Sequence, residues 1–164
     1  MRIAIVFFSR AGKTAELADT ISLALGPQKA ELIQINVLKQ KEKKKSFGLA
    51  NKHKLKLIST QTDLSKFDLI FFGSEVEGMS PKRKLPEEII VYLQECTGIE
   101  GKSTAVFLNC FGIPGTSLQK IQSILQTRNA KIINNKIFTY LLGLTKKQLE
   151  EAKEFAQKTR EKIR

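Results

Sequence analysis

The sequence predicts an α/β fold, a three-layer sandwich in which helices cover both faces of a five-stranded parallel sheet. Apolar runs of strand length alternate along the chain with segments whose apolar residues recur at helical spacing. Two of these runs, 3–8 and 69–72, are apolar throughout, which is typical of parallel strands buried on both faces. The 164 residues show no internal repeat, so we expect a single domain over 1–164.

The first part of the chain predicts a strand, a helix and two further strands. The strand at 3–8 leads into a helix over 14–25, which ends at Gly26-Pro27 because glycine terminates helices and proline cannot continue them. A second strand is expected at 31–37, where apolar and polar residues alternate moderately. A third is expected at 68–73 and should lie centrally in the sheet, as the first should.

The second part of the chain continues the alternation. Pro86 suits the first turn of a helix, and a strand is expected at 104–108. Thr116 is expected to cap the next helix, and the last strand should fall within 132–142. The final helix begins at Thr145 and carries one apolar stripe among charges. Five strands and about five helices result.

The segment 39–58 is rich in lysine and is predicted as either a short helix or a loop. Its eight lysines surround four apolar residues, Phe47, Leu49, Leu55 and Leu57. A linker between two domains is the competing interpretation. The preceding residues hold only two strands and one helix, which is too little for a separate core, so the single domain is retained.

The charge of the chain is its unusual compositional feature. There are 28 Lys and Arg against 16 Asp and Glu, a formal net charge of +12. This excess favours acidic partners, nucleic acid or an anionic membrane. Nucleic acid is unlikely, because the lysine-rich segment lacks interleaved aromatic residues and has only Phe47. A charged face that is merely solvated is the simpler alternative.

Cysteine and histidine usage argues against a metal site. Cys96 and Cys110 lack CxxC spacing and His53 is the single histidine, so no structural zinc set is expected. A reduced, cytoplasmic protein without a membrane span or signal peptide fits this composition.

No catalytic set is predicted either. His53 alone cannot complete a Ser/His/Asp arrangement, and the acidic pairs Glu87-Glu88 and Glu150-Glu151 are interpreted as solvated helix faces. Any catalysis would therefore come from a cofactor.

The turn at 9–14 is predicted to bind an anion. It joins a buried strand to a helix, so that backbone N–H groups and the positive end of the helix converge there. Gly12 permits a positive φ or a close approach of the backbone to a ligand. The alternative is an ordinary turn capped by Ser9 or Thr14. A nucleoside triphosphate loop is excluded, because Phe7 stands where that motif needs glycine.

The segment 5–21 around this turn resembles the flavodoxin signature. That signature has two apolar residues and an aromatic, Ser or Thr, a small residue three positions on, Thr two positions later, and then Ala and an aliphatic residue in the helix. These places are filled by Ile5, Val6, Phe7, Ser9, Gly12, Thr14, Ala18 and Ile21. The segment 67–74 is similar to the family's third strand and its entry into a flavin-contacting loop.

The resemblance implies the flavodoxin-like strand order 2-1-3-4-5, with flavin mononucleotide (FMN) at the carboxyl ends of the strands, between the first and third. It implies phosphate contacts from Ser9, Arg10, Ala11, Gly12, Lys13 and Thr14. It implies that two further loops flank the flavin ring, namely Ser74, Glu75, Val76, Glu77, Gly78 and Met79, and Asn109, Cys110, Phe111 and Gly112.

The second loop departs from the family pattern. The family commonly has proline after the serine and an aromatic residue where this chain has Glu77. Phe111 could stack on one face of the ring and Met79 could cover the other. The alternative is that Phe111 only closes the sheet edge. Cys110 is expected to be a small buried residue rather than a reactive thiol.

Three functions follow from these features. The first is an FMN-binding electron carrier that passes one or two electrons between redox partners, as a monomer or homodimer. An acidic partner would dock on its lysines, and its basic charge would make the reduction potential less negative than that of acidic flavodoxins. The second is an FMN-dependent NAD(P)H:quinone-type reductase. The third is a flavin-free module that uses the same fold and its basic surface to bind acidic partners or nucleic acid.

Overall fold

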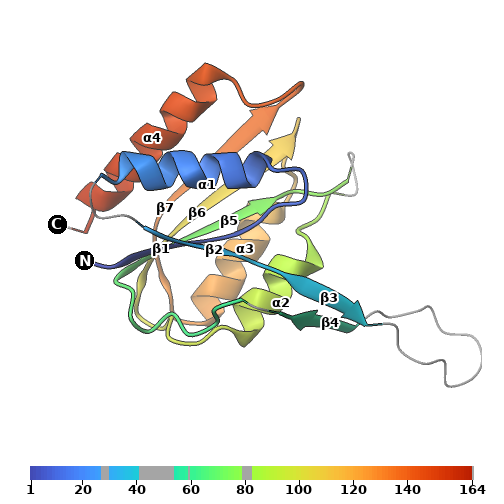
Figure 1. Cartoon of the computed structure of the whole chain (residues 1–164), viewed down its shortest axis with the longest axis vertical. Coiled ribbons are helices and arrows are strands. Elements are labelled where there is room, and N and C mark those ends of the chain that lie inside the picture. The colour runs from blue at the N-terminus through green and yellow to red at the C-terminus, as the bar shows by residue number, and fades with distance from the viewer. Residues whose placement is uncertain (27–29, 41–53, 59, 79–82, 164) are drawn as a thin grey trace, which may run out of the picture.

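The fold is built on a five-stranded parallel sheet, seen in our computed structural model of the chain (Figure 1). The structure describes residues 1–26, 30–40, 54–58, 60–78 and 83–163. The sheet has the order β2-β1-β5-β6-β7. Its strands are β1 (Ile3–Phe8), β2 (Glu31–Gln34), β5 (Leu69–Glu75), β6 (Ser103–Phe111) and β7 (Lys131–Tyr140). The predicted order 2-1-3-4-5 is confirmed.

Four helices in the described residues form the two outer layers. Helices α1 (Lys13–Ala24) and α4 (Lys146–Glu161) pack together on one face of the sheet. Helices α2 (Glu87–Glu95) and α3 (Ser117–Thr127) cover the other face (Figure 1). Each face has its own apolar core.

The all-apolar composition of β1 is explained by these two cores. Successive side chains of a strand point to opposite faces of the sheet. Ile3, Ile5 and Phe7 belong to the core under α1 and α4, whereas Val6 and Phe8 belong to the core under α2 and α3. A central parallel strand therefore has no solvent-facing position that would carry a polar residue.

A small second sheet was not predicted. Strand β3 (Val37–Gln40) pairs antiparallel with β4 (Lys54–Leu57), so the expected strand at 31–37 is two strands, and residues 54–57 of the expected helix or loop are also a strand. Val37 lies opposite Leu57, and both pack against the core under α2. Residues 41–53, including Phe47, Leu49 and His53, lie outside the described residues.

The two threonines expected to cap helices behave differently. The side chain of Thr145 accepts a hydrogen bond from the Gln148 N–H, and the Gln148 side chain accepts one from the Thr145 N–H, which makes a capping box at the start of α4. Thr116 precedes α3, but its side chain makes no capping hydrogen bond. Its backbone lies at φ −92° and ψ 13°, outside the extended region that a capping residue typically adopts.

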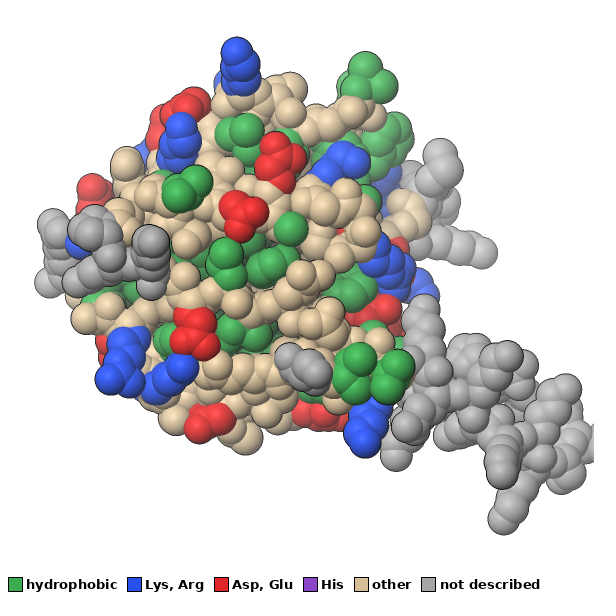
Figure 2. Space-filling model, in the orientation of Figure 1, with side chains coloured by type: hydrophobic (Ala, Val, Ile, Leu, Met, Phe, Trp, Pro, Cys, Tyr) green, Lys and Arg blue, Asp and Glu red, His purple; other side chains and the backbone are tan. Residues whose placement is uncertain are grey.

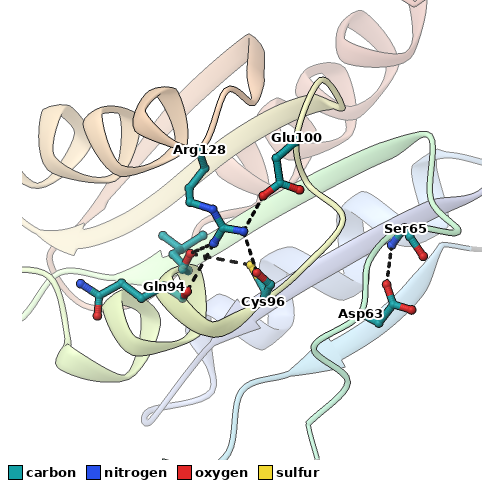
Figure 3. Close-up of polar contacts among 7 residues, drawn as sticks. Asp63, Ser65, Gln94, Cys96, Glu100 and Arg128 are labelled. Atoms are coloured by element: carbon teal, nitrogen blue, oxygen red, sulfur yellow. Dashed lines mark hydrogen bonds and ion pairs between the residues drawn. The ribbon is translucent and has the colours of Figure 1, made fainter.

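The C-terminal end of α2 is closed by Arg128, which follows α3 (Figure 3). Its guanidinium donates at 2.8 Å to the carbonyls of Leu93 and of Cys96, and at 2.6 Å to the carboxylate of Glu100. A positive group at this end satisfies carbonyls that have no partner within the helix. In the same view, the Asp63 carboxylate accepts from the Ser65 N–H at 3.0 Å, within the loop before β5.

Replacing Arg128 with alanine should lower the free energy of unfolding by about 2 kcal/mol at pH 7, because the carbonyls of Leu93 and Cys96 and the Glu100 carboxylate lose their donor. The Arg128 hydrogen bond lowers the pKa of Glu100. Stability from a lowered carboxyl pKa is present above the unfolded value and is lost as pH falls through the folded value. The difference in the free energy of unfolding between wild type and variant, measured by urea denaturation, should therefore become smaller from pH 7 to pH 3. The change should be slight, because Glu100 is largely exposed.

Glu100→Gln is the matched control, since it removes the titrating group and leaves the carbonyl contacts of Arg128 in place. It should cost under about 1 kcal/mol at pH 7. In this background, Arg128→Ala should cost the same at pH 7 and pH 3. If Arg128→Ala cost less than about 0.5 kcal/mol, its hydrogen bonds to the carbonyls at the C-terminal end of α2 would not stabilise the fold as proposed.

Candidate functional site

The turn predicted to bind an anion lies at the carboxyl end of β1. The chain leaves β1 through α1 to β2 on one side and later returns to β5 on the other, so this turn lies at the switch point of the sheet. Gly12 is the N-cap of α1, with φ +82°. Among the residues that the structure describes, no side chain caps the helix, so neither Ser9 nor Thr14 acts as the cap of an ordinary turn. Ser9 Oγ accepts only a long hydrogen bond, 3.4 Å, from the Ala15 N–H.

Backbone donors are available in this turn. Within the described part of the chain, the N–H groups of residues 11–14 donate no hydrogen bond. They lie at the positive end of α1, where the helix dipole favours an anion. The conformation of Gly12, rather than crowding, requires glycine, because an added Cβ would meet nothing within 4 Å. The geometry of the turn therefore suits a phosphate.

Thr14 and Asn109 form a buried polar pair beside the turn. The Thr14 hydroxyl donates to Asn109 Oδ1 at 2.7 Å, and both side chains are buried. Asn109 Nδ2 is buried without a partner in the described structure. A buried donor left unpaired is costly, so a ligand oxygen that reached this amide would gain from it. The Thr14 side chain faces Asn109 rather than the open side of the turn.

Arg10 is surrounded by carboxylates. Its guanidinium forms ion pairs with Glu77 and, at 2.6 Å, with Glu88, and its backbone N–H donates to Glu75 at 3.2 Å. The side chain of Glu88 is only 4% exposed. The interpretation of Glu88 as part of a solvated helix face is therefore wrong: the residue lies in the first turn of α2 and faces the strand ends. Glu87 beside it is exposed.

The electrostatics of this cluster favour a charged Arg10. Burial lowers the pKa of Arg10, but the hydrogen bond and charge of Glu88 and the charges of Glu77 and Glu75 outweigh burial and raise it. Arg10 therefore stays protonated. Its positive charge is already compensated by its acidic neighbours before any ligand phosphate arrives.

The loop after β5 is hydrogen-bonded to β6 and to the segment before α2. The Val76 N–H donates to the Asn109 carbonyl at 2.9 Å, and Glu77 exchanges backbone hydrogen bonds with Lys84. Ser74 is buried and its hydroxyl donates to the Glu75 carbonyl. The Glu77 side chain is engaged with Arg10, at the position where the resembled family places an aromatic residue. Met79 lies outside the described residues.

The last residues of β6 and β7 form an aromatic pair. Phe111 packs edge-on against Tyr140, with ring centroids 6.2 Å apart, and Lys13 Nζ lies 4.6 Å from the centre of the Tyr140 ring. The guanidinium of Arg83 donates to the Ile113 carbonyl and lies against Gly112. Tyr140 was not predicted from the sequence as a site residue. Its position at the end of the last strand could have indicated it, because the carboxyl ends of parallel strands meet at the same edge of the sheet.

Cys110 is a small buried residue near the end of β6, as expected from the sequence. Burial raises the pKa of its thiol, against a smaller opposite effect of Arg83. The side chain lies too deep and is too weakly acidic for a reactive thiolate.

The structure brings all three predicted segments to one edge of the sheet. Ser9 to Thr14 follows β1, whereas Ser74 to Gly78 and Asn109 to Gly112 include the last residues of the adjacent strands β5 and β6 and the start of the loops after them. Free N–H donors, the unpaired Asn109 amide and the aromatic pair give this edge groups that suit a phosphate and a flat ring. These observations fit FMN, whereas the carboxylates around Arg10 compete with its phosphate.

Comparison with known proteins supports the fold. No family model matches the sequence, and no curated protein is significantly similar to it. Among solved structures, oxidised Flavodoxin 1 and Flavodoxin 2 of Bacillus cereus align with TM-scores of 0.67 and 0.68 at 19% and 18% identity, covering 98% and 99% of both chains. A flavodoxin from the domain Archaea aligns with a TM-score of 0.65 at 17% identity, covering 99% of both chains. The chain has a flavodoxin-like fold.

Proposed function

We propose that this chain is a single-domain, cytoplasmic FMN-binding protein that carries electrons between redox partners. The observation that carries the proposal is the set of free N–H groups at residues 11–14, at the N-terminus of α1 and at the switch point of the sheet. The flavodoxin-like fold supports it. In the proposal, residues 9–14 hold the phosphate, and residues 74–79 and 109–112 flank the ring.

Bound FMN would supply the one- or two-electron redox chemistry, and the chain would position the cofactor and exclude water from it. The free N–H groups would bind phosphate oxygens, and Asn109 Nδ2 would find an acceptor in the ligand. The Phe111 and Tyr140 rings would shield one side of the flavin from water. Of the nearby cations, Lys13 would favour an anionic reduced flavin more than Arg10, whose charge is compensated.

The test is a comparison of FMN with riboflavin, which has the same ring and lacks the phosphate. Several charge-assisted hydrogen bonds at the turn should make FMN bind roughly 100-fold more tightly than riboflavin, as measured by flavin fluorescence titration. Equal affinities would contradict a phosphate site at residues 9–14. The absence of binding by either flavin would overturn the proposed cofactor.

Gly12→Ala should reduce this discrimination. Alanine is strained at a φ of +82°, so the N–H groups would turn away from their common point. We expect FMN affinity to fall roughly tenfold with riboflavin affinity unchanged. Gly101→Ala is the control, since Gly101 has a similar φ of +72° and open space but lies before β6, at the opposite edge. Equal losses in both variants would contradict the assignment.

A flavin-free module is the second candidate, and the carboxylates around Arg10 favour it. Glu75 already accepts a hydrogen bond from the Arg10 N–H, and Glu77 replaces the aromatic residue of the resembled family. The same turn would then bind another phosphate compound. If both flavins fail to bind, titration with inorganic phosphate and ribose 5-phosphate would examine this candidate.

A further inference from the structure

Exposed apolar side chains gather at the end of β6 and on the loops after β6 and β7, at the carboxyl edge of the sheet. Leu142 is fully exposed, and Leu141 and Ile113 are 72% and 70% exposed, with Phe111 half-exposed beside them. The loops are adjacent, because the Gly112 N–H donates to the Tyr140 carbonyl at 3.3 Å. Figure 2 shows hydrophobic side chains projecting at the upper right, where Figure 1 has the loop between β7 and α4. We call Phe111, Ile113, Leu141 and Leu142 the apolar tip.

Cations border the apolar tip. Lys13 lies over the Tyr140 ring, and Arg83 contacts the Ile113 carbonyl. Lys146 and Lys147 are exposed and begin α4, directly after the tip. Three of these four cations lie at helix N-termini, where the helix dipole disfavours positive charge.

The carboxylates near this edge already have partners. Glu75 ends β5, and its carboxylate accepts a hydrogen bond from the Arg10 N–H at 3.2 Å. Glu150 and Glu151 follow one turn into α4, and each is paired with a lysine. The outward surface of the tip is therefore apolar and positive, which is complementary to an apolar layer beneath anionic head groups.

We propose that the apolar tip binds the surface of an anionic lipid bilayer. The aliphatic side chains project from loops, and a bilayer can close around such projections. Four side chains are few for a protein interface, which typically takes 20 to 30 residues on each side. In the described residues no helix is long and apolar enough to cross a membrane. The proposal does not depend on bound FMN.

The test is co-sedimentation of the full chain with vesicles, with and without FMN. Vesicles of 70% phosphatidylcholine and 30% phosphatidylglycerol should bind the protein, and vesicles of phosphatidylcholine alone should bind it at least roughly tenfold more weakly. Leu141→Ser/Leu142→Ser should lower binding to the anionic vesicles roughly tenfold with no change in charge. Leu23→Ser, at an exposed position of α1 away from the tip, should leave binding unchanged.

A pair of charge variants separates the tip from the net charge of +12. Lys146→Gln/Lys147→Gln and Lys153→Gln/Lys158→Gln change the charge of α4 equally, but only the first pair borders the tip. The first should weaken vesicle binding roughly tenfold and the second at most about twofold. Equal effects, or binding unaffected by the leucine changes, would show non-specific charge attraction and overturn the proposal. An absence of binding to anionic vesicles would also overturn it and leave an acidic protein as the occupant of this edge.

Discussion

Replacing Gly73 with alanine should lower the free energy of unfolding by about 3 kcal/mol and the Tm by roughly 10 °C. Gly73 lies in β5, at the centre of the sheet, under the ring of Phe107 from the adjacent strand β6. An added Cβ would lie 2.1 Å from the nearest atom of this ring, and Phe107 is fully buried. Neither strand can move without breaking the ladder on its other side. Thermal and urea denaturation measure the effect.

A second substitution shows whether the ring is the cause. Phe107→Leu alone should cost about 1.5 kcal/mol, because it removes buried ring atoms. In the double variant Gly73→Ala/Phe107→Leu, the methyl group has space, so the total cost should be at least about 1 kcal/mol below the sum of the single costs. Gly101→Ala is the control for loss of a glycine, and should cost about 1 kcal/mol from its φ of +72° alone. A Gly73→Ala variant as stable as wild type would contradict the packing described.

Much of the fold was predictable because local patterns determine it. The runs 3–8 and 69–72 are apolar at every position because each faces two cores, and this pattern alone placed both strands at the centre of the sheet. The small sheet was not predicted. In β4, Lys54–Leu57, charged and apolar residues alternate, but the neighbouring lysines concealed this period of two.

The loops of the candidate site were predictable, and their internal contacts were not. A strand followed by a small polar turn and a helix identifies residues 9–14 as an anion site from local sequence. The partners of Arg10 lie 65 to 78 residues away, and only the folded sheet brings them together. Composition therefore made Glu88 look solvated, because an acidic residue in the first turn of a helix is usually exposed. The pairing of Glu77 with Arg10 was hidden for the same reason.

Replacing Arg10 with alanine should lower the free energy of unfolding by about 2 to 3 kcal/mol, because the buried carboxylate of Glu88 loses its partner. This loss is at or below the low end of what is usual for breaking a buried ion pair. The Arg10 side chain is 46% exposed, so water can take its place beside Glu88. Because the pKa of Arg10 is raised above its ordinary value, its contribution is fully present at neutral pH. The difference between wild type and variant should therefore be constant from pH 6 to about pH 9 in urea denaturation.

The double variant Arg10→Ala/Glu88→Gln identifies the cause of this loss. Removing the buried charge together with its partner should recover more than half of the stability, since a neutral amide is far less costly to bury than an unpaired carboxylate. Lys66→Ala is the matched control, because it breaks an exposed ion pair of similar length, 2.8 Å to Glu31, and should cost under about 0.5 kcal/mol. If Arg10→Ala cost no more than Lys66→Ala, the pair with Glu88 would be a surface contact, and the carboxylates would be free to turn away from the phosphate turn.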